Sequence, residues 1–178
     1  NNGTIRAHNQ TSSADGIITT DNVVTIDGSG TIVFRTGSSN SFMTTTGAGQ
    51  ITLGAGQLVT GAGELDGSFV NNGVISADLA ATFGVGPMQL DVGPFINNNL
   101  STAEPGSNLD ILDVLVTQDA GAAIESNDGL VTIGVNSRIE NGSLRSIGSG
   151  LFRTASGGNR ELSAVTLDGT LQIDQGTT

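Results

Sequence analysis

The stretch from Gly47 to Gly67 reads GAGQITL-GAGQLVT-GAGELDG, three consecutive seven-residue repeats in one register. Each repeat opens with Gly-Ala-Gly, continues with Gln50, Gln57 or Glu64, and then becomes aliphatic. A seven-residue period is typical of coiled coils, but two glycines in each repeat cost a helix about 2 kcal/mol relative to alanine. The repeat therefore predicts a small-residue corner followed by a short strand. Three such sides make one 21-residue coil of a β-solenoid.

A looser motif recurs along the rest of the chain: Asn or Asp, then Gly, then a spacer and an aliphatic residue. It occurs at Asn2–Ile5, Asn72–Ile75, Asn141–Leu144 and Asp168–Leu171, with variants at Gly30–Ile32, Asp128–Val131 and Asn98–Leu100. Asn-Gly and Asp-Gly tolerate left-handed backbone, so each motif predicts a corner that leads into a strand. The irregular spacing of the motifs indicates loops of varying length that leave a regular core.

Short aliphatic runs follow most of these corners and are the expected strands. They are Gly16–Thr19, Val23–Ile26, Thr31–Phe34, Ile51–Leu53, Leu58–Thr60, Ser68–Val70, Val74–Ser76, Leu109–Thr117, Leu130–Ile133, Ser143–Arg145, Ala164–Leu167 and Thr170–Ile173. Alternation in the last run predicts that Leu171 and Ile173 point inward and Gln172 outward. Ile51, Leu58, Val70 and Ile75 are expected to share a core, because they follow small-residue corners.

Two stretches interrupt this rhythm and contain all three prolines. Phe83–Phe95 (FGVGPMQLDVGPF) predicts either a wider coil or a small protrusion. Thr102–Asn108 (TAEPGSN) predicts a loop. No ten-residue window other than Leu109–Thr117 and its surroundings is credible as a helix, and the valines of that run favour a strand there too.

Composition and charge exclude several classes of protein. The 178 residues include 27 glycines, six aromatic residues that are all phenylalanine, and no cysteine. A core of small aliphatic side chains suits thin stacked layers, and disulfides and cysteine-ligated metals are excluded. The net charge of −11 argues against nucleic acid and anionic membranes as partners. No apolar run is long enough to insert into a bilayer.

Three segments resemble repeats of a known group of proteins. NNGTIRA at 1–7, NNGVISA at 71–77 and ENGSLRS at 140–146 are similar to repeats in bacterial autotransporter passenger domains and filamentous-haemagglutinin-type adhesins. The resemblance implies a right-handed parallel β-helix that is secreted and displayed on the cell surface.

Few residues suggest a chemistry. His8 is the only histidine, and the local spacing indicates no Ser-His-Asp grouping around it, so we interpret it as a solvated loop residue. Asp110, Asp113 and Asp119 are interpreted as surface carboxylates, with calcium binding or acid–base catalysis on a glycan as the alternatives. We therefore expect no enzyme activity, no cofactor and no metal site.

Together these observations predict an all-β protein: a right-handed parallel β-helix of about seven to nine coils with roughly 20 to 25 residues in each. The alternative is an antiparallel β-sandwich built from the same strands and turns. Residues 1–178 are expected to form a single β-solenoid domain that is a segment of a longer chain or a fibre subunit, since neither Asn1–Ala7 nor Thr170–Thr178 resembles a cap.

The expected function is structural or adhesive, in a bacterial surface or extracellular protein. Expected partners are the chain itself through end-to-end stacking into filaments, neighbouring repeats of the same chain, and host or matrix glycans or proteins. A carbohydrate-binding or polysaccharide-degrading β-helix is the alternative function. An ice-binding solenoid would need a flat threonine face at coil spacing, and no regular Thr-x-Thr ladder occurs in the sequence.

Overall fold

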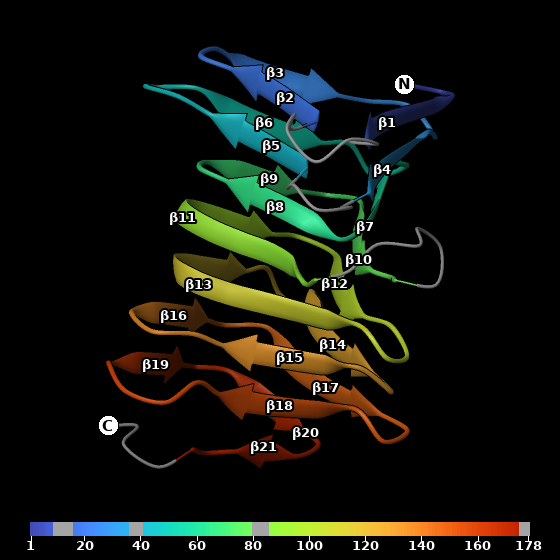
Figure 1. Cartoon of the computed structure of the whole chain (residues 1–178). Helices are drawn as coiled ribbons and strands as arrows, with labels where there is room; N and C mark the ends of the chain where they lie inside the picture. The colour runs from blue at the N-terminus through green and yellow to red at the C-terminus, as the bar shows by residue number, and fades with distance from the viewer. Residues whose placement is uncertain (9–15, 36–40, 80–85, 175–178) are drawn as a thin grey trace.

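The computed structural model describes residues 1–8, 16–35, 41–79 and 86–174. In these residues the chain forms 21 β-strands and no helix, and the strands pair in parallel (Figure 1). The described part therefore contains no helix that could cross a membrane. Parallel pairing also rules out the antiparallel sandwich for this part of the chain.

The strands stack in three rows, one for each side of the solenoid. Row A consists of β1 Thr4–His8, β4 Thr31–Arg35, β7 Leu58–Gly61, β10 Val74–Ala77, β12 Leu100–Ala103, β14 Ala123–Asn127, β17 Ser143–Ile147 and β20 Thr166–Asp168. Row B consists of β2 Gly16–Thr20, β5 Ser41–Thr45, β8 Gly63–Asp66, β11 Met88–Asn97, β13 Asn108–Gln118, β15 Leu130–Ile133, β18 Leu151–Thr154 and β21 Leu171–Gln172. Row C consists of β3 Val23–Ile26, β6 Gln50–Leu53, β9 Phe69–Asn71, the second halves of β11 and β13, β16 Ser137–Glu140 and β19 Arg160–Ser163.

Rows B and C form a single 13-stranded sheet, because β11 and β13 each continue through the corner from one row to the next. Val92 and Asp113 adopt positive φ where these strands bend, at +43° and +46°. In Figure 1 the row B strands cross the front, the row C strands return behind them, and the chain descends from the N-terminus. This path is a right-handed helix, the fold predicted from the sequence.

The Gly-Ala-Gly repeats form successive sides of the solenoid, as predicted. Their strands are β6, β7 and β8, which belong to rows C, A and B in turn. The repeat glycines are needed where coils stack closely: a Cβ on Gly56 would lie 2.4 Å from the backbone oxygen of Gly28 in the preceding coil. No L side chain fits there without displacing backbone, which explains the small-residue corner.

The coils differ in length more than predicted. The paired Thr4 and Thr31 are 27 residues apart, whereas the paired Leu58 and Val74 are 16 apart. Row A passes through eight levels from β1 to β20, which corresponds to about seven turns of the chain, compared with the seven to nine coils expected. Three-residue strands and single-residue corners shorten the middle of the solenoid, and the sequence motifs do not reveal this shortening.

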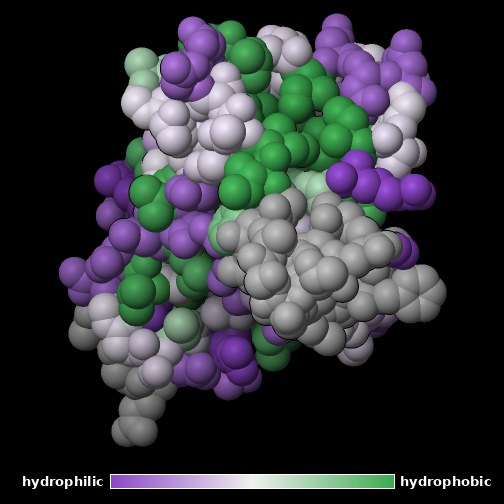
Figure 2. Space-filling model, turned by 45° about the horizontal axis from the view of Figure 1, so that its top comes forward, coloured by the Kyte–Doolittle hydropathy of each residue, from purple (hydrophilic) through white to green (hydrophobic). Residues whose placement is uncertain are grey.

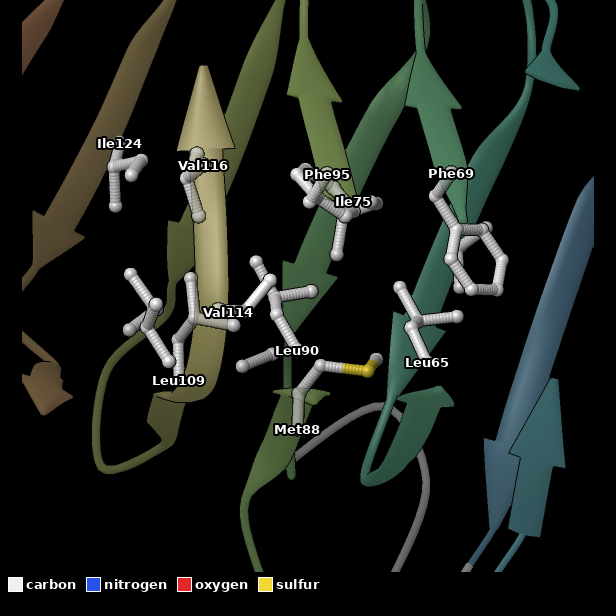
Figure 3. Close-up of a cluster of buried hydrophobic side chains, with 14 of the residues drawn as sticks. Leu65, Phe69, Ile75, Met88, Leu90, Phe95, Leu109, Val114, Val116 and Ile124 are labelled. Carbon is white, nitrogen blue, oxygen red and sulfur yellow. The ribbon is translucent and has the colours of Figure 1, made fainter. Parts of the chain in front are cut away.

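The core consists of side chains stacked in register from coil to coil. In row A, Ile32, Val59, Ile75, Ile124 and Leu144 occupy one inward position and are fully buried. Phe69 and Phe95 stack in row C with ring centroids 6.4 Å apart. Figure 3 shows these rings among aliphatic side chains of the neighbouring coils. Each coil thus buries its apolar side chains against the next.

Two of the four predicted core residues are correct. Ile51 and Ile75 are buried, as predicted. Leu58 and Val70 are only half-buried and lie on the outward side of their strands, so their prediction was wrong. The inward residue next to Leu58 is Val59, and the one next to Val70 is Phe69. A shift of one residue in a strand moves every side chain to the opposite face.

The predicted strands mostly match the observed ones within one or two residues, but several strands had no predicted counterpart. These are β5, β11, β14, β16, β18 and β19. Phe83–Phe95 belongs in part to the long strand β11, and residues 83–85 lie outside the described residues. Thr102–Asn108 contains a turn at Pro105 and Gly106 between β12 and β13. At the C-terminal end Leu171 packs against the core, whereas Ile173 is exposed.

Candidate functional site

Carboxylates gather on the outer face of row B, near the middle of the solenoid. Glu64 and Asp66 come from β8, Asp91 from β11, and Asp110 and Asp113 from β13. Alternation directs Glu64, Asp66, Asp91 and Asp110 away from the core, because Leu65, Leu90 and Ile111 fill the inward positions. Asp113 is exposed because it lies at the corner where β13 bends with positive φ. We call these five residues the acidic ladder.

The parallel register brings the members of the acidic ladder together. Asp66 lies directly opposite Asp91, and Glu64 and Asp110 lie on either side of Gln89. Neighbouring strands are about 4.8 Å apart, so like charges face each other without a basic residue between them. Thr44 donates a hydrogen bond from its hydroxyl to Asp66 Oδ2 at 3.4 Å at the N-terminal end of this face.

The environment raises the pKa of two of these carboxyls through burial and mutual repulsion. Partial burial raises the pKa of Glu64, and the charges of Asp91 and Asp66 raise it further. Partial burial likewise raises the pKa of Asp91, with added repulsion from Asp66 and Asp113. A backbone hydrogen bond from Val92 to Asp91 Oδ1 at 2.9 Å acts in the opposite direction. These carboxyls therefore keep a proton to a higher pH than an ordinary exposed one.

Asp110 behaves similarly but has compensating partners. Burial raises its pKa, while a hydrogen bond from the Thr132 side chain and the charge of Arg153 lower it. Thr132 and Arg153 follow Asp110 at the same outward position, in β15 and β18. The acidic ladder therefore ends toward the C-terminus in a hydroxyl and a guanidinium.

The three aspartates singled out in the sequence do not form one group. Asp110 and Asp113 belong to the acidic ladder, whereas Asp119 lies at the other corner, beyond the end of β13. Its carbonyl accepts the backbone hydrogen bond of Ala122 at 3.0 Å, so its backbone helps to form that corner. His8 ends β1 opposite Arg35, and its side chain lies outside the described part of the structure.

Sequence reasoning missed Glu64, Asp66 and Asp91. A signal for them is present: the segments Glu-Leu-Asp at 64–66 and Gln-Leu-Asp at 89–91 share an alternation with one inward leucine. Aligning these segments as neighbouring strands predicts the outward stack. The intervening residues 80–85 and the short row C strand β9 obscure that alignment in the sequence.

The interior contains a second stack of polar residues, also missed in the sequence. Asn71, Asn97 and Gln118 are buried at successive levels of row C. Asn71 Nδ2 donates to Asn97 Oδ1 at 2.9 Å, and Asn97 Nδ2 donates to Gln118 Oε1 at 3.2 Å. We call these three residues the amide ladder.

The amide ladder also binds the backbone of the corner between rows C and A. Asn71 Nδ2 donates to Leu100 O at 3.0 Å, and Asn97 Nδ2 donates to Ala123 O at 3.0 Å. Gln118 Nε2 continues the series by donating to Asn141 O at 3.1 Å. Each amide therefore satisfies a buried carbonyl of the next coil.

Outside the two ladders, the described residues offer few groups for metal or ligand binding. No group of three or more histidines, aspartates and glutamates there is placed to hold a metal ion. An open hollow is lined by Asn136, Ser137, Arg138, Asn159, Arg160 and Glu161. Its two arginines already have partners: Arg138 pairs with Glu140 at 2.7 Å, and Arg160 donates to Gly158 O at 2.9 Å.

Comparisons with protein-family models, with curated proteins and with solved structures found no match.

Proposed function

We propose that this chain is a structural segment of a bacterial surface or extracellular protein, a stiff rod with adhesive sides. The observation that carries the proposal is the continuity of the core from coil to coil. The inward row A stack that runs from Ile32 to Leu144 is aliphatic except at Ser101, and all its members are buried. In such a stack every coil depends on its neighbours, so the rod resists bending and local opening.

The outer surface supports an extended role rather than a concave binding site. The acidic ladder and the net charge of −11 make the sides polar and keep neighbouring rods apart at low ionic strength. Basic groups on the sides are largely neutralised by ion pairs, such as Arg145 with Glu125 and Arg138 with Glu161. A surface of this kind fits contact with neutral glycans or with basic protein patches.

Single-molecule pulling tests this function. The chain is inserted between two marker domains of known unfolding force and stretched from its ends. We expect unfolding in successive steps that each release one or a few coils, because force along the rod axis peels the parallel strands of one level from those of the next. Unfolding of the whole chain in a single event would overturn the proposal.

A polysaccharide-binding or polysaccharide-degrading β-helix is a second candidate, supported by the acidic ladder. Two carboxylates at a set separation can hydrolyse a glycosidic bond, and the raised pKa of Glu64 suits a general acid. Incubation with a panel of neutral and acidic polysaccharides tests it. We expect no turnover; turnover that disappears in Glu64→Gln or in Asp110→Asn with Asp113→Asn would favour the enzyme.

A further inference from the structure

Both ends of the solenoid leave core positions uncovered. Ile5 begins the row A core stack and is 39% exposed, and Leu167 ends it and is 43% exposed. The stacked residues between them, such as Ile32 and Leu144, are fully buried. Among the described residues the edge strands β1 and β20 each pair on one side only, so both present unpaired backbone groups to whatever lies beyond.

The N-terminal end has a continuous apolar surface. Figure 2 shows apolar atoms across the middle of this end, with polar residues around them. The apolar side chains exposed there include Ile5, Ile17 and Val23, and the partly buried Ile18 packs against the core just beneath. At the opposite end Ile173 is 66% exposed beside the partly buried Leu171.

The charges at the two ends are complementary. One outward position of row A runs from Arg6 at the N-terminal end to Asp168 at the C-terminal end. Within this stack Glu125 and Arg145 form an ion pair between neighbouring coils. In the described residues no ion pair involves Arg6 or Asp168, and both side chains are exposed. Each end thus offers the charge that the other end needs.

We propose that a second copy of this chain covers each end, with β1 of one copy added in parallel to β20 of the other. The register of row A places Ile5 over Leu167 and Arg6 over Asp168. The register of row B then places Ile18 over Ile173, next to the core position of β21. Buried apolar contact, an ion pair and main-chain hydrogen bonds all continue across the junction in the pattern they have inside the rod.

Row C ends one level earlier than the other two rows, at β19, so the junction depends on rows A and B. Because the N-terminal end of one copy meets the C-terminal end of another, the contact does not close on itself and produces a filament. This inference rests on the proposed structural function and specifies its partner as the chain itself.

Charge reversal at the two ends tests the junction. Arg6→Glu puts two acidic groups at every junction, and Asp168→Arg puts two basic groups there. We expect wild type to associate with rising concentration in sedimentation velocity, and each variant alone to associate at least about tenfold more weakly. An equimolar mixture of the two variants pairs a glutamate with an arginine at one junction and the native pair at the next. The mixture should therefore form filaments that neither variant forms alone.

Asp66→Arg is the matched control for Asp168→Arg, because it makes the same change in net charge on the side of the rod. It should associate like wild type. Wild type that remains a monomer at all concentrations, or variants that associate as wild type does, would overturn the inference. So would a mixture that does not recover association, once circular dichroism has shown that both variants are folded. Pulling experiments on single molecules do not depend on stacking. A monomer that unfolds stepwise, coil by coil, would therefore refute the junction and leave the structural function intact.

Discussion

The amide ladder and the acidic ladder lie on the same strands but have opposite energetic consequences. Both stack polar side chains in register across β11 and β13, one facing the interior and the other facing solvent. In the amide ladder each side chain is both donor and acceptor, so Asn71, Asn97 and Gln118 bind each other in series. In the acidic ladder every ionised member only accepts, and neighbours such as Asp66 and Asp91 repel.

The comparison shows that coil stacking amplifies the chemistry of whatever side chain it repeats. Placing like residues about 4.8 Å apart strengthens complementary groups and penalises equal charges. The amides are tolerated in the core because all their polar atoms have partners. The carboxylates are tolerated outside because water and protonation relieve their repulsion. Substitutions that add a charge to the amide ladder or remove one from the acidic ladder test this comparison directly.

The largest effect is expected from a charge in the amide ladder. Asn97→Asp removes the donor to Gln118 Oε1 and Ala123 O and buries a carboxylate among acceptors. We expect a loss of about 3 to 5 kcal/mol in the free energy of unfolding, measured by urea denaturation at pH 7. Asn99→Asp, at an exposed position two residues away, is the control and should cost less than about 1 kcal/mol. Equal losses of unfolding free energy in the two variants would show that burial in the amide ladder does not make the added charge costly.

Removing the polarity of one amide should cost less than adding a charge. Asn97→Leu leaves Ala123 O without its side-chain donor and Asn71 Nδ2 without its amide acceptor. We expect a loss of about 1 to 3 kcal/mol by the same measurement. The equivalent inward position is already apolar at Leu53, which pairs with Asn71 in the preceding coil. Leucine therefore fits the space, and a loss above that of Asn97→Asp would contradict the argument.

Removing one charge from the acidic ladder should stabilise the protein slightly. Asp91→Asn relieves repulsion with Asp66 and Asp113 and keeps the size of the side chain. We expect a gain of roughly 0.5 kcal/mol at pH 7, small because solvent screens this face. Thermal denaturation at low and high salt measures it, and the gain should shrink as salt rises. A destabilised variant at low salt would mean that Asp91 has an attractive partner.

The smallest effect is the pH dependence of the same face. The pKa values of Glu64, Asp91 and Asp110 are raised in the folded state, mainly by burial. The folded chain therefore binds more protons than the unfolded chain, and these groups lower the stability as pH rises from about 4 through their folded pKa values. The variant carrying Glu64→Gln, Asp91→Asn and Asp110→Asn should gain stability over wild type as pH rises from 4 to 7.

Asp128 provides the opposite control. The backbone and hydroxyl of Ser149 donate to its carboxylate, at 2.6 and 2.9 Å, and lower its pKa. Its contribution is present above the ordinary aspartate pKa and disappears as pH falls through the folded value. Asp128→Asn should therefore be less stable than wild type at pH 7, and the two stabilities should converge in strong acid. Urea denaturation across this pH range would show two trends of opposite sign.

Particular residues show how far the sequence could lead. The Gly-Ala-Gly repeats predict three sides of one coil, because glycine and alanine are required where coils stack closely. The motif Asn72-Gly73 predicts a corner, and the corner is there. The residue just before it, Asn71, is buried and is the first member of the amide ladder. In the sequence Asn71 looks like another polar turn residue, and only its stacking partners distinguish it.

The sequence by itself determined the all-β parallel solenoid, the short strands and the approximate coil length. These properties follow from local chemistry: small residues at corners, aliphatic residues in strands, and too little aromatic volume for a thick core. Only the tertiary structure decided which residues are neighbours across coils. Coil lengths vary from 16 to 27 residues, so the partner of Asp66 or Asn71 is not at a fixed distance along the chain. Both ladders depend on that register, because each is an interaction between coils and no single segment contains it.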